Sequence, residues 1–235
     1  MAEEALAGPN LNLRAASPAP RRLVVVVMDG ASLGIMSFAF GVFDAAVYYG
    51  ALPGLDVRIV SGEPDAAIRG GGLAYDVPYD LHAIRQADLV IVPYWRDPAE
   101  HPPEPLLESL RGAHAAGARV AGLCSGVFVL AAAGLLDERP ATTHWALAGV
   151  LAQMYPKISV RASVLYIDDG DILTAGGGAA GMDLGLHLIR TSHGAVVANR
   201  LARSIVVPPT VRAGSRSTSS RRYPNWTRTT PSARR

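Results

Sequence analysis

The chain has 235 residues, of which 49% are apolar and 18% are charged, and this is enough apolar content to bury the core of one substantial domain. The composition excludes disorder over most of the chain, because burial of so much apolar surface offsets the entropy lost on ordering. The single cysteine, Cys124, excludes an intrachain disulfide and a zinc site made of four cysteines.

The net charge of +2 hides an uneven distribution. Residues 210–235 contain seven arginines and no acidic residue. Since the whole chain has 22 basic and 20 acidic residues, residues 1–209 keep 15 basic residues against 20 acidic ones, a charge of −5. The predicted globular part is therefore not a basic platform for nucleic acid.

Short β-branched runs alternate with helical segments along the chain. Buried strands are predicted at 23–28, 57–61, 89–93 and 119–123, and helices at 36–49, 106–116 and 127–133. Residues 70–80 predict a turn and a short extended segment. Residues 160–168 and 172–174 predict a hairpin turned by Asp169-Gly170, and helical character returns at 182–190 and 194–203. The alternation predicts an α/β fold with a mostly parallel sheet and helices on both of its faces.

No membrane or export segment is expected. The first 20 residues lack the continuous apolar stretch of a signal peptide. The uncharged run 120–136 is slightly short for a membrane span and is interrupted by glycines and a serine. We therefore expect a cytoplasmic protein.

Residues 120–130 contain the most informative chemical pattern. A buried strand ends at Leu123, Cys124 follows at once, and a helix begins within two residues. This order is typical of a nucleophile elbow, in which small neighbours permit a strained backbone at the nucleophile. It would place the sulfur at the amino end of a helix, which favours the thiolate, and point the Ser125 N–H at a developing oxyanion. The alternative is that Cys124 is an ordinary small buried residue.

His144 is the second candidate, as a base that holds Cys124 as a thiolate or shuttles protons. The alternative is a structural histidine in a turn. Asp168, Asp169 and Asp171 surround a glycine, and a solvated hairpin turn explains them better than a metal site. The glycine runs match no phosphate-binding motif. We therefore expect neither a metal nor a cofactor.

Four segments occur in the order found in a known family: the Cys124 elbow, Ala141–Trp145, Tyr166–Thr174 and Ala175–Asp183. Together they resemble the ThiJ/PfpI superfamily, and more closely the amino-terminal domain of AraC-type transcriptional regulators of the GlxA kind. The likeness covers about residues 21–209. It implies a flavodoxin-like three-layer sandwich, related to class I glutamine amidotransferases, that usually forms a dimer.

The resemblance also implies which residues surround the site. Enzymes of this superfamily use a cysteine, a nearby histidine and an acidic residue from the loop after the first strand. Cys124 and His144 match, but residues 30–41 contain no Asp or Glu, and Ile35 takes the place of the acid. Tyr94 stands where the family has a glycine and would crowd the pocket. Both departures favour binding over turnover. The expected ligand contacts are Gly30, Ile35, Tyr94, Trp95, Cys124, Ser125, His144 and Trp145.

The expected organisation is a disordered arm at 1–20, a ThiJ/PfpI-like domain at 21–209 and a disordered arginine-rich tail at 210–235. A regulator of this family would continue into a helix-turn-helix part, which the tail does not resemble. The tail is a plain disordered segment, a nonspecific DNA-binding arm, or an out-of-frame translation. With GC-rich codons, a shifted frame at Thr210 encodes His-Arg-Ala-Gly-Gly-Lys-Pro-Gln-Tyr-Val-Val, which resembles the family's linker.

Three hypotheses about function follow. The first is a ligand-sensing domain without its helix-turn-helix, which forms a homodimer, binds a small metabolite near Cys124 and reaches DNA only through the missing part; no enzymatic activity is then expected. The second is a standalone cysteine-dependent hydrolase, amidase or isonitrile-hydratase-like lyase, in which Cys124 attacks and His144 shuttles protons. The third is a redox sensor that forms a sulfenic acid at Cys124, although the chain has no resolving cysteine.

Overall fold

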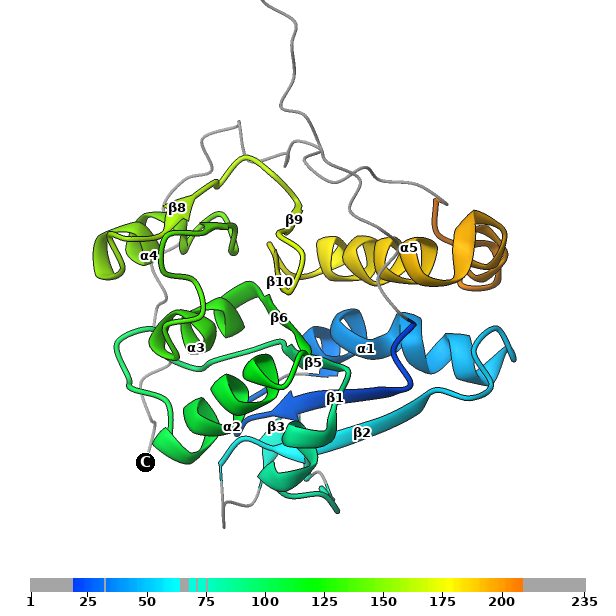
Figure 1. Ribbon diagram of the computed structural model, residues 1–235, viewed down its shortest axis with the longest axis horizontal. Coiled ribbons are helices and arrows are strands. Elements are labelled where there is room, and N and C mark those ends of the chain that lie inside the picture. The colour runs from blue at the N-terminus through cyan, green and yellow to red at the C-terminus, as the bar shows by residue number, and fades with distance from the viewer. Residues whose placement is uncertain (1–18, 32, 64–67, 71, 75, 209–235) are drawn as a thin grey trace, which may run out of the picture.

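The computed structural model describes residues 19–208, except residues 32, 64–67, 71 and 75. Its centre is a six-stranded sheet with the order β2-β1-β5-β6-β10-β9 (Figure 1). The strands are β1 (Arg22–Val27), β2 (Asp56–Ser61), β5 (Leu89–Val92), β6 (Arg119–Leu123), β9 (Tyr166–Asp168) and β10 (Ile172–Ala175). The first five strands in this order are parallel and β9 pairs antiparallel to β10, so the predicted α/β fold and the predicted hairpin are confirmed.

Helices cover both faces of the sheet (Figure 1). Helices α1 (Leu33–Tyr48) and α5 (Ala179–Ser204) pack on one face, and α2 (Glu104–Ala115), α3 (Val127–Ala132) and the 3₁₀ helix η1 (Leu81–Gln86) pack on the other. Successive residues of β1 alternate between the two apolar clusters. This is why the strand appears in the sequence as an unbroken apolar run.

The short strands β3 (Arg69–Gly70) and β4 (Leu73–Ala74) pair antiparallel and overlap the turn and short extended segment predicted at residues 70–80. The pair of β7 (Pro140–Ala141) with β8 (Ser159–Val160) and the helix α4 (Ala148–Met154) were not predicted. The prediction of one strand over 160–168 is wrong at its start. Val160 pairs with Ala141 in β7, and β9 begins only at Tyr166. Between them, the Val164 carbonyl accepts a hydrogen bond from the Thr142 hydroxyl rather than from a neighbouring strand.

Helix α5 contains one break, at Gly194, where φ is 88° and ψ is 164°. Glycine adopts this positive φ at little cost. The two helical segments predicted near the end of the domain are thus two parts of one long, broken helix. Within the described residues, no helix combines the length and the apolar character needed to cross a bilayer. The predicted tail at 210–235 and most of the predicted arm at 1–20 lie outside the described residues.

Gly126 marks the closest approach between the elbow and β5. It belongs to the 3₁₀ turn η2 (Cys124–Gly126), and a Cβ atom built on it would lie 2.0 Å from the backbone carbonyl oxygen of Val92. Its own φ of −60° is ordinary, so the close approach of the Val92 carbonyl and the Tyr94 backbone nitrogen, rather than the backbone conformation, forbids a side chain. A backbone oxygen in a buried strand cannot rotate away from the added atom.

The variant Gly126→Ala is expected to lower the free energy of unfolding by about 2–3 kcal/mol, because the added methyl group overpacks this contact. Urea unfolding would measure the change. The matched control is Gly149→Ala in α4, where a Cβ atom meets nothing within 4 Å. The control is expected to raise the free energy of unfolding by about 0.5–1 kcal/mol. Equal stability of Gly126→Ala and the unsubstituted protein would contradict the close packing.

Candidate functional site

Cys124 lies on a strained turn between β6 and α3. Its φ of 51° is in the left-handed region, which costs a residue other than glycine about 1–2 kcal/mol. The hydroxyl of the buried Thr143 donates a hydrogen bond of 2.6 Å to the Cys124 carbonyl oxygen and helps to hold the turn. The predicted nucleophile-elbow position of the cysteine is confirmed.

Glycines let two other loops approach this turn. A Cβ atom on Gly177, in the loop between β10 and α5, would lie 2.5 Å from Cys124 Cβ and 3.1 Å from Cys124 Sγ. Gly177 also has a φ of 83°. On the other side, a Cβ atom on Gly30 would lie 3.4 Å from the Tyr94 hydroxyl, so the Tyr94 side chain reaches the loop after β1. Loops from the carboxyl ends of β1, β5, β6 and β10 therefore meet at one edge of the sheet, where α/β proteins bind ligands. We call this region the Cys124 edge.

Burial controls the protonation of the two candidate catalytic groups. Burial raises the pKa of the Cys124 thiol, and a hydrogen bond from the Ser125 N–H lowers it by less. Burial also lowers the pKa of His144. Burial therefore opposes the thiolate that the elbow position predicts, and it favours the neutral imidazole of His144.

The segment of His144 lies beside the elbow in space, because His144 follows Thr143, whose hydroxyl bonds to the Cys124 carbonyl. Its own contacts are local. His144 Nδ1 accepts a hydrogen bond of 3.4 Å from the Ala146 N–H, and its ring tilts against Trp145 with 5.3 Å between ring centroids. In the part of the chain that the structure describes, no hydrogen bond joins His144 to the Cys124 thiol. The two residues lie in neighbouring segments, but they do not form a bonded nucleophile and base.

Trp95 is a core residue with only 1% of its surface exposed. Its indole N–H donates to the Glu100 carbonyl, and its backbone N–H donates a 3.0 Å bond to the Ser125 hydroxyl. The Trp95 ring thus packs in the interior and fixes the loop after β5 to the elbow. Of the other expected contacts, Trp145 is exposed and Ile35 lies half-buried in the first turn of α1.

A carboxylate does reach the same end of the sheet, although the loop after β1 contains none. Glu63, which follows β2, accepts a hydrogen bond of 2.7 Å from the Asp29 N–H and pairs with the guanidinium of Arg96. Arg96 also pairs with Glu100. These carboxylates are therefore engaged with Arg96 rather than with a histidine. Sequence reasoning missed this cluster, and only the spacing of four residues between Arg96 and Glu100 hinted at it.

Two further buried threonines hold the segment that leads to His144. The Thr142 N–H donates a 3.0 Å hydrogen bond to the Thr174 hydroxyl on β10, and the Thr142 hydroxyl donates to the Val164 carbonyl. Thr142, Thr143 and Thr174 are all fully or almost fully buried. Sequence reasoning did not assign them a role, and the polar pair Thr142-Thr143 beside a candidate histidine was the available signal.

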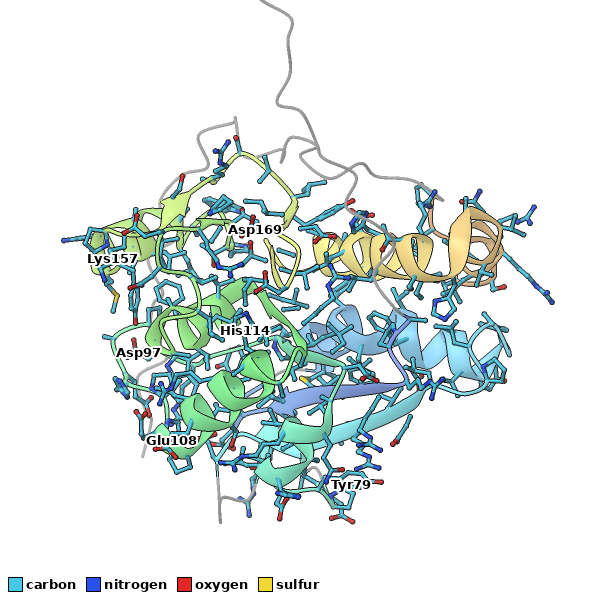
Figure 2. The ribbon with its side chains drawn as sticks, in the orientation of Figure 1. Tyr79, Asp97, Glu108, His114, Lys157 and Asp169 are labelled. Carbon is cyan, nitrogen blue, oxygen red and sulfur yellow. The ribbon has the colours of Figure 1, made fainter. Side chains whose placement is uncertain are left out.

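The three aspartates of the hairpin are bound by basic side chains from other elements. Asp168 pairs with Arg119 at 2.9 Å and with His187 at 2.7 Å. Asp171 pairs with Arg139 at 2.8 Å and with His114 at 2.6 Å, and Asp169 pairs with Arg139. Figure 2 labels His114 on α2 and Asp169 on the hairpin. The arginine ion pairs fasten the hairpin to β6 and to the loop before β7, and the bonds to His187 and His114 fasten it to α5 and α2 on opposite faces of the sheet.

Comparison with known proteins identifies the family that shares this sequence and fold. The DJ-1/PfpI family model matches residues 21–191. The HTH-type transcriptional regulator CdhR of Pseudomonas aeruginosa is 31% identical over 150 residues, which cover 64% of this chain and 44% of that protein. The HTH-type transcriptional regulator GlxA of Rhizobium meliloti is 40% identical over 94 residues, which cover 40% of this chain and 29% of that protein. The predicted resemblance is confirmed, and these matches span less than half the length of either regulator.

Two more similarities bear on the site. The isonitrile hydratase of Pseudomonas putida is 40% identical over 85 residues, which cover 36% of each chain. The crystal structure of an AraC family transcriptional regulator from Pseudomonas putida matches with a TM-score of 0.67 and 23% identity, over 78% of this chain and 98% of that chain. At this identity the structural match shows a shared fold.

The ion pairs of the hairpin predict a loss of stability in acid. The guanidinium of Arg139 holds the pKa of Asp171 well below its usual range, and the bonds from His187 and Arg119 lower the pKa of Asp168 despite its burial. A carboxyl group whose pKa is lower in the folded state stabilises the fold above its unfolded pKa of about 3.9, and this contribution is lost as the pH falls towards the folded pKa. We expect the free energy of unfolding to decline below about pH 5.

The variants Asp168→Asn and Asp171→Asn test this. Each is expected to flatten the decline in the free energy of unfolding between about pH 5 and pH 2, and to cost about 1 kcal/mol at pH 7 through the lost bonds. The control is Asp137→Asn, which removes only a surface pair with Lys157 and leaves the slope unchanged. Urea unfolding at a series of pH values measures all four proteins. Identical slopes for the two hairpin variants and the unsubstituted protein would contradict the prediction.

Proposed function

Because the chain belongs to the DJ-1/PfpI family, we propose that it is a ligand-sensing domain of an AraC-type transcriptional regulator. The domain binds a small metabolite at the Cys124 edge, where Tyr94, Cys124, Ser125 and His144 surround the ligand with Gly30 and Gly177. DNA binding belongs to a helix-turn-helix part of such a regulator, since residues 1–209 have a charge of −5.

The contacts of His144 are the observation that favours sensing over catalysis. A cysteine nucleophile needs a thiolate or an adjacent base. Here His144 bonds to the Ala146 N–H instead of the sulfur, and burial raises the pKa of the thiol. A neutral, half-buried thiol suits contact with the apolar part of a small molecule.

The loop between β10 and α5 supplies a polar group for such a ligand. Gly178 precedes α5 without any side-chain hydrogen bond that caps the helix. The N–H groups of Ala180 and Gly181 donate to the carbonyls of Gly177 and Gly178, so among the described residues the Ala179 N–H is the one left without a partner in this turn. It lies two residues after Gly177, which contacts Cys124. The ligand that fits combines an apolar portion against the thiol with an oxygen that accepts from this N–H group.

The second candidate function is a cysteine-dependent lyase or hydrolase. The observation in its favour is the 40% identity to an isonitrile hydratase over 85 residues. In this alternative, the Cys124 thiolate attacks the substrate carbon, His144 transfers the proton, and the Ser125 N–H stabilises the developing charge. A substrate that displaces water would have to bring His144 and Cys124 into contact before the first step.

The pH dependence of Cys124 alkylation separates the two functions. Since Cys124 is the only cysteine, iodoacetamide labels one site, and Cys124→Ser is the matched blank. The rate is expected to rise with a midpoint above the ordinary thiol value of about 8.5, because burial opposes the thiolate. A metabolite bound at this edge is expected to slow the labelling about tenfold at ten times its Kd. Intact mass measures both effects.

The enzyme alternative makes the opposite forecast. It requires a midpoint below about 7 and turnover of an aliphatic isonitrile that both Cys124→Ser and His144→Gln abolish. That combination would overturn the sensor proposal. Absence of turnover together with a midpoint above the ordinary value would support it.

We also propose that the domain forms a homodimer through the outward face of α1. Helix α1 buries Met36, Val42 and Phe43 against its own domain, yet Leu33 and Phe38 stay 45% and 39% exposed. Its only charged residue is Asp44. A helix that is apolar on both sides is typical of an element with a partner on each side.

Light scattering after gel filtration tests the dimer. The full chain is expected to elute with twice the mass of one chain, and Phe38→Glu is expected to elute as a monomer, because a buried unpaired carboxylate opposes association. The matched control is Val150→Glu on α4, a residue with 40% exposure on another helix, which should remain dimeric. A monomeric full chain, or a dimeric Phe38→Glu, would contradict the proposal.

A further inference from the structure

A cavity of about 670 Å³ lies at the opposite edge of the sheet from Cys124. Residues 19–21 before β1, the turn 51–55 between α1 and β2, Asp88 before β5 and His193 of α5 line it. Because the strands are parallel, these residues lie at the amino ends of β1 and β5, whereas Cys124 lies at the carboxyl end of β6. The volume falls within the range of small-molecule sites. We call it the amino-edge cavity.

The cavity combines an apolar floor with two cationic or polar donors. Leu52 and Leu55 are buried and form the floor. The exposed guanidinium of Arg21 has no hydrogen bond or ion pair to any residue that the structure describes. His193 Nδ1 lies 2.8 Å from the Ser192 hydroxyl, and its Nε2 has no partner among the described residues.

Asp88 is the one acidic residue among those that line the cavity, and its carboxylate already accepts hydrogen bonds from the protein backbone. Its Oδ2 atom accepts hydrogen bonds of 2.8 Å from the backbone N–H groups of Arg21 and Arg22. These bonds hold the carboxylate against the start of β1 and offset part of its charge. Arg21 and His193 are thus left to contact a ligand, while the remaining charge of Asp88 disfavours a ligand with two negative charges.

We propose that the amino-edge cavity binds a monocarboxylate with a compact apolar body, such as an aromatic or branched aliphatic acid. Arginine forms paired hydrogen bonds with a carboxylate through its planar guanidinium, and His193 Nε2 supplies a further contact. The apolar body covers Leu52 and Leu55. The site is separate from the Cys124 edge and does not depend on the function proposed there.

The position of His193 gives this site a route to the rest of the domain. His193 directly precedes the break at Gly194, so a ligand that holds His193 also fixes the geometry of the break. The same helix begins next to Gly177, which contacts Cys124. In Figure 1, α5 starts beside β10 and runs along α1 to the right-hand side of the molecule. Helix α5 therefore connects a carboxylate bound in the cavity with two places. One is the segment 195–204 after the break, and the other is the loop at Gly177, which contacts Cys124.

Benzoate is the probe for this site, titrated into the full chain labelled with nitrogen-15. Saturable amide shifts are expected in residues 51–55 and 193–195. The variants Arg21→Gln and His193→Gln are expected to raise the Kd for benzoate, the first by about tenfold or more. The matched control is Arg161→Gln, an exposed arginine that follows β8, which leaves the Kd unchanged. Methyl benzoate, which lacks the charge, is expected to bind about tenfold more weakly than benzoate.

Alkylation of Cys124 separates this site from the first one. Protein carrying the label on Cys124 is expected to bind benzoate with the same Kd. The proposal is overturned if benzoate gives no saturable shifts up to about 10 mM, if Arg21→Gln binds it as the unsubstituted protein does, or if the shifts gather around Cys124 and vanish on alkylation. Equal thermal midpoints for the variants would establish that a weaker Kd comes from the lost contact.

Discussion

The left-handed backbone of Cys124 is the constraint on which the rest of the site depends. A residue with a side chain at a φ of 51° is stable only when its surroundings hold it there. The hydrogen bond from Thr143 to the Cys124 carbonyl supplies one part of that support. The absence of side chains at Gly126 and Gly177 supplies the other, because any Cβ atom there would collide with Val92 or with Cys124 itself. One turn thus draws together segments from β5, β6, β10 and the loop before α4.

The same crowding decides the chemistry of the thiol. Gly177 packs against Cys124, and the partial burial of the sulfur raises its pKa and so favours the neutral thiol. The backbone of Cys124 has the geometry of a nucleophile elbow, but the raised pKa of its thiol suits a neutral side chain that packs against an apolar group. Regulators and an isonitrile hydratase are both among the relatives of this chain, and a shared fold does not by itself determine the function of the site. A base or a cation beside the sulfur would be needed to change one function into the other.

Sequence reasoning predicted the features that depend on local pattern. The apolar runs of β1 and β5, the turn at Asp169-Gly170 and the cysteine between a strand and a helix each carry a signal within a few residues. It failed where the outcome depends on distant partners. Burial opposes the predicted thiolate at Cys124, and one of the close neighbours of the cysteine is Gly177, 53 positions away in the chain. Likewise, the sequence predicts Trp95 as a ligand contact, whereas in the fold its ring is buried and its indole N–H donates to the Glu100 carbonyl.

Helix α5 links these observations. Its first turn follows the glycine that contacts Cys124, and its break at Gly194 adjoins the histidine of the amino-edge cavity. The segment between them packs along α1, whose outer face is apolar and exposed. A ligand at either end of α5 therefore meets a rigid element that already touches the proposed dimer helix. Gly194 is the one residue inside α5 with a non-helical backbone conformation. We therefore expect a change in the direction of the helix to take place at this residue. Any signal that passes along α5 in the proposed sensor must change the geometry at that residue.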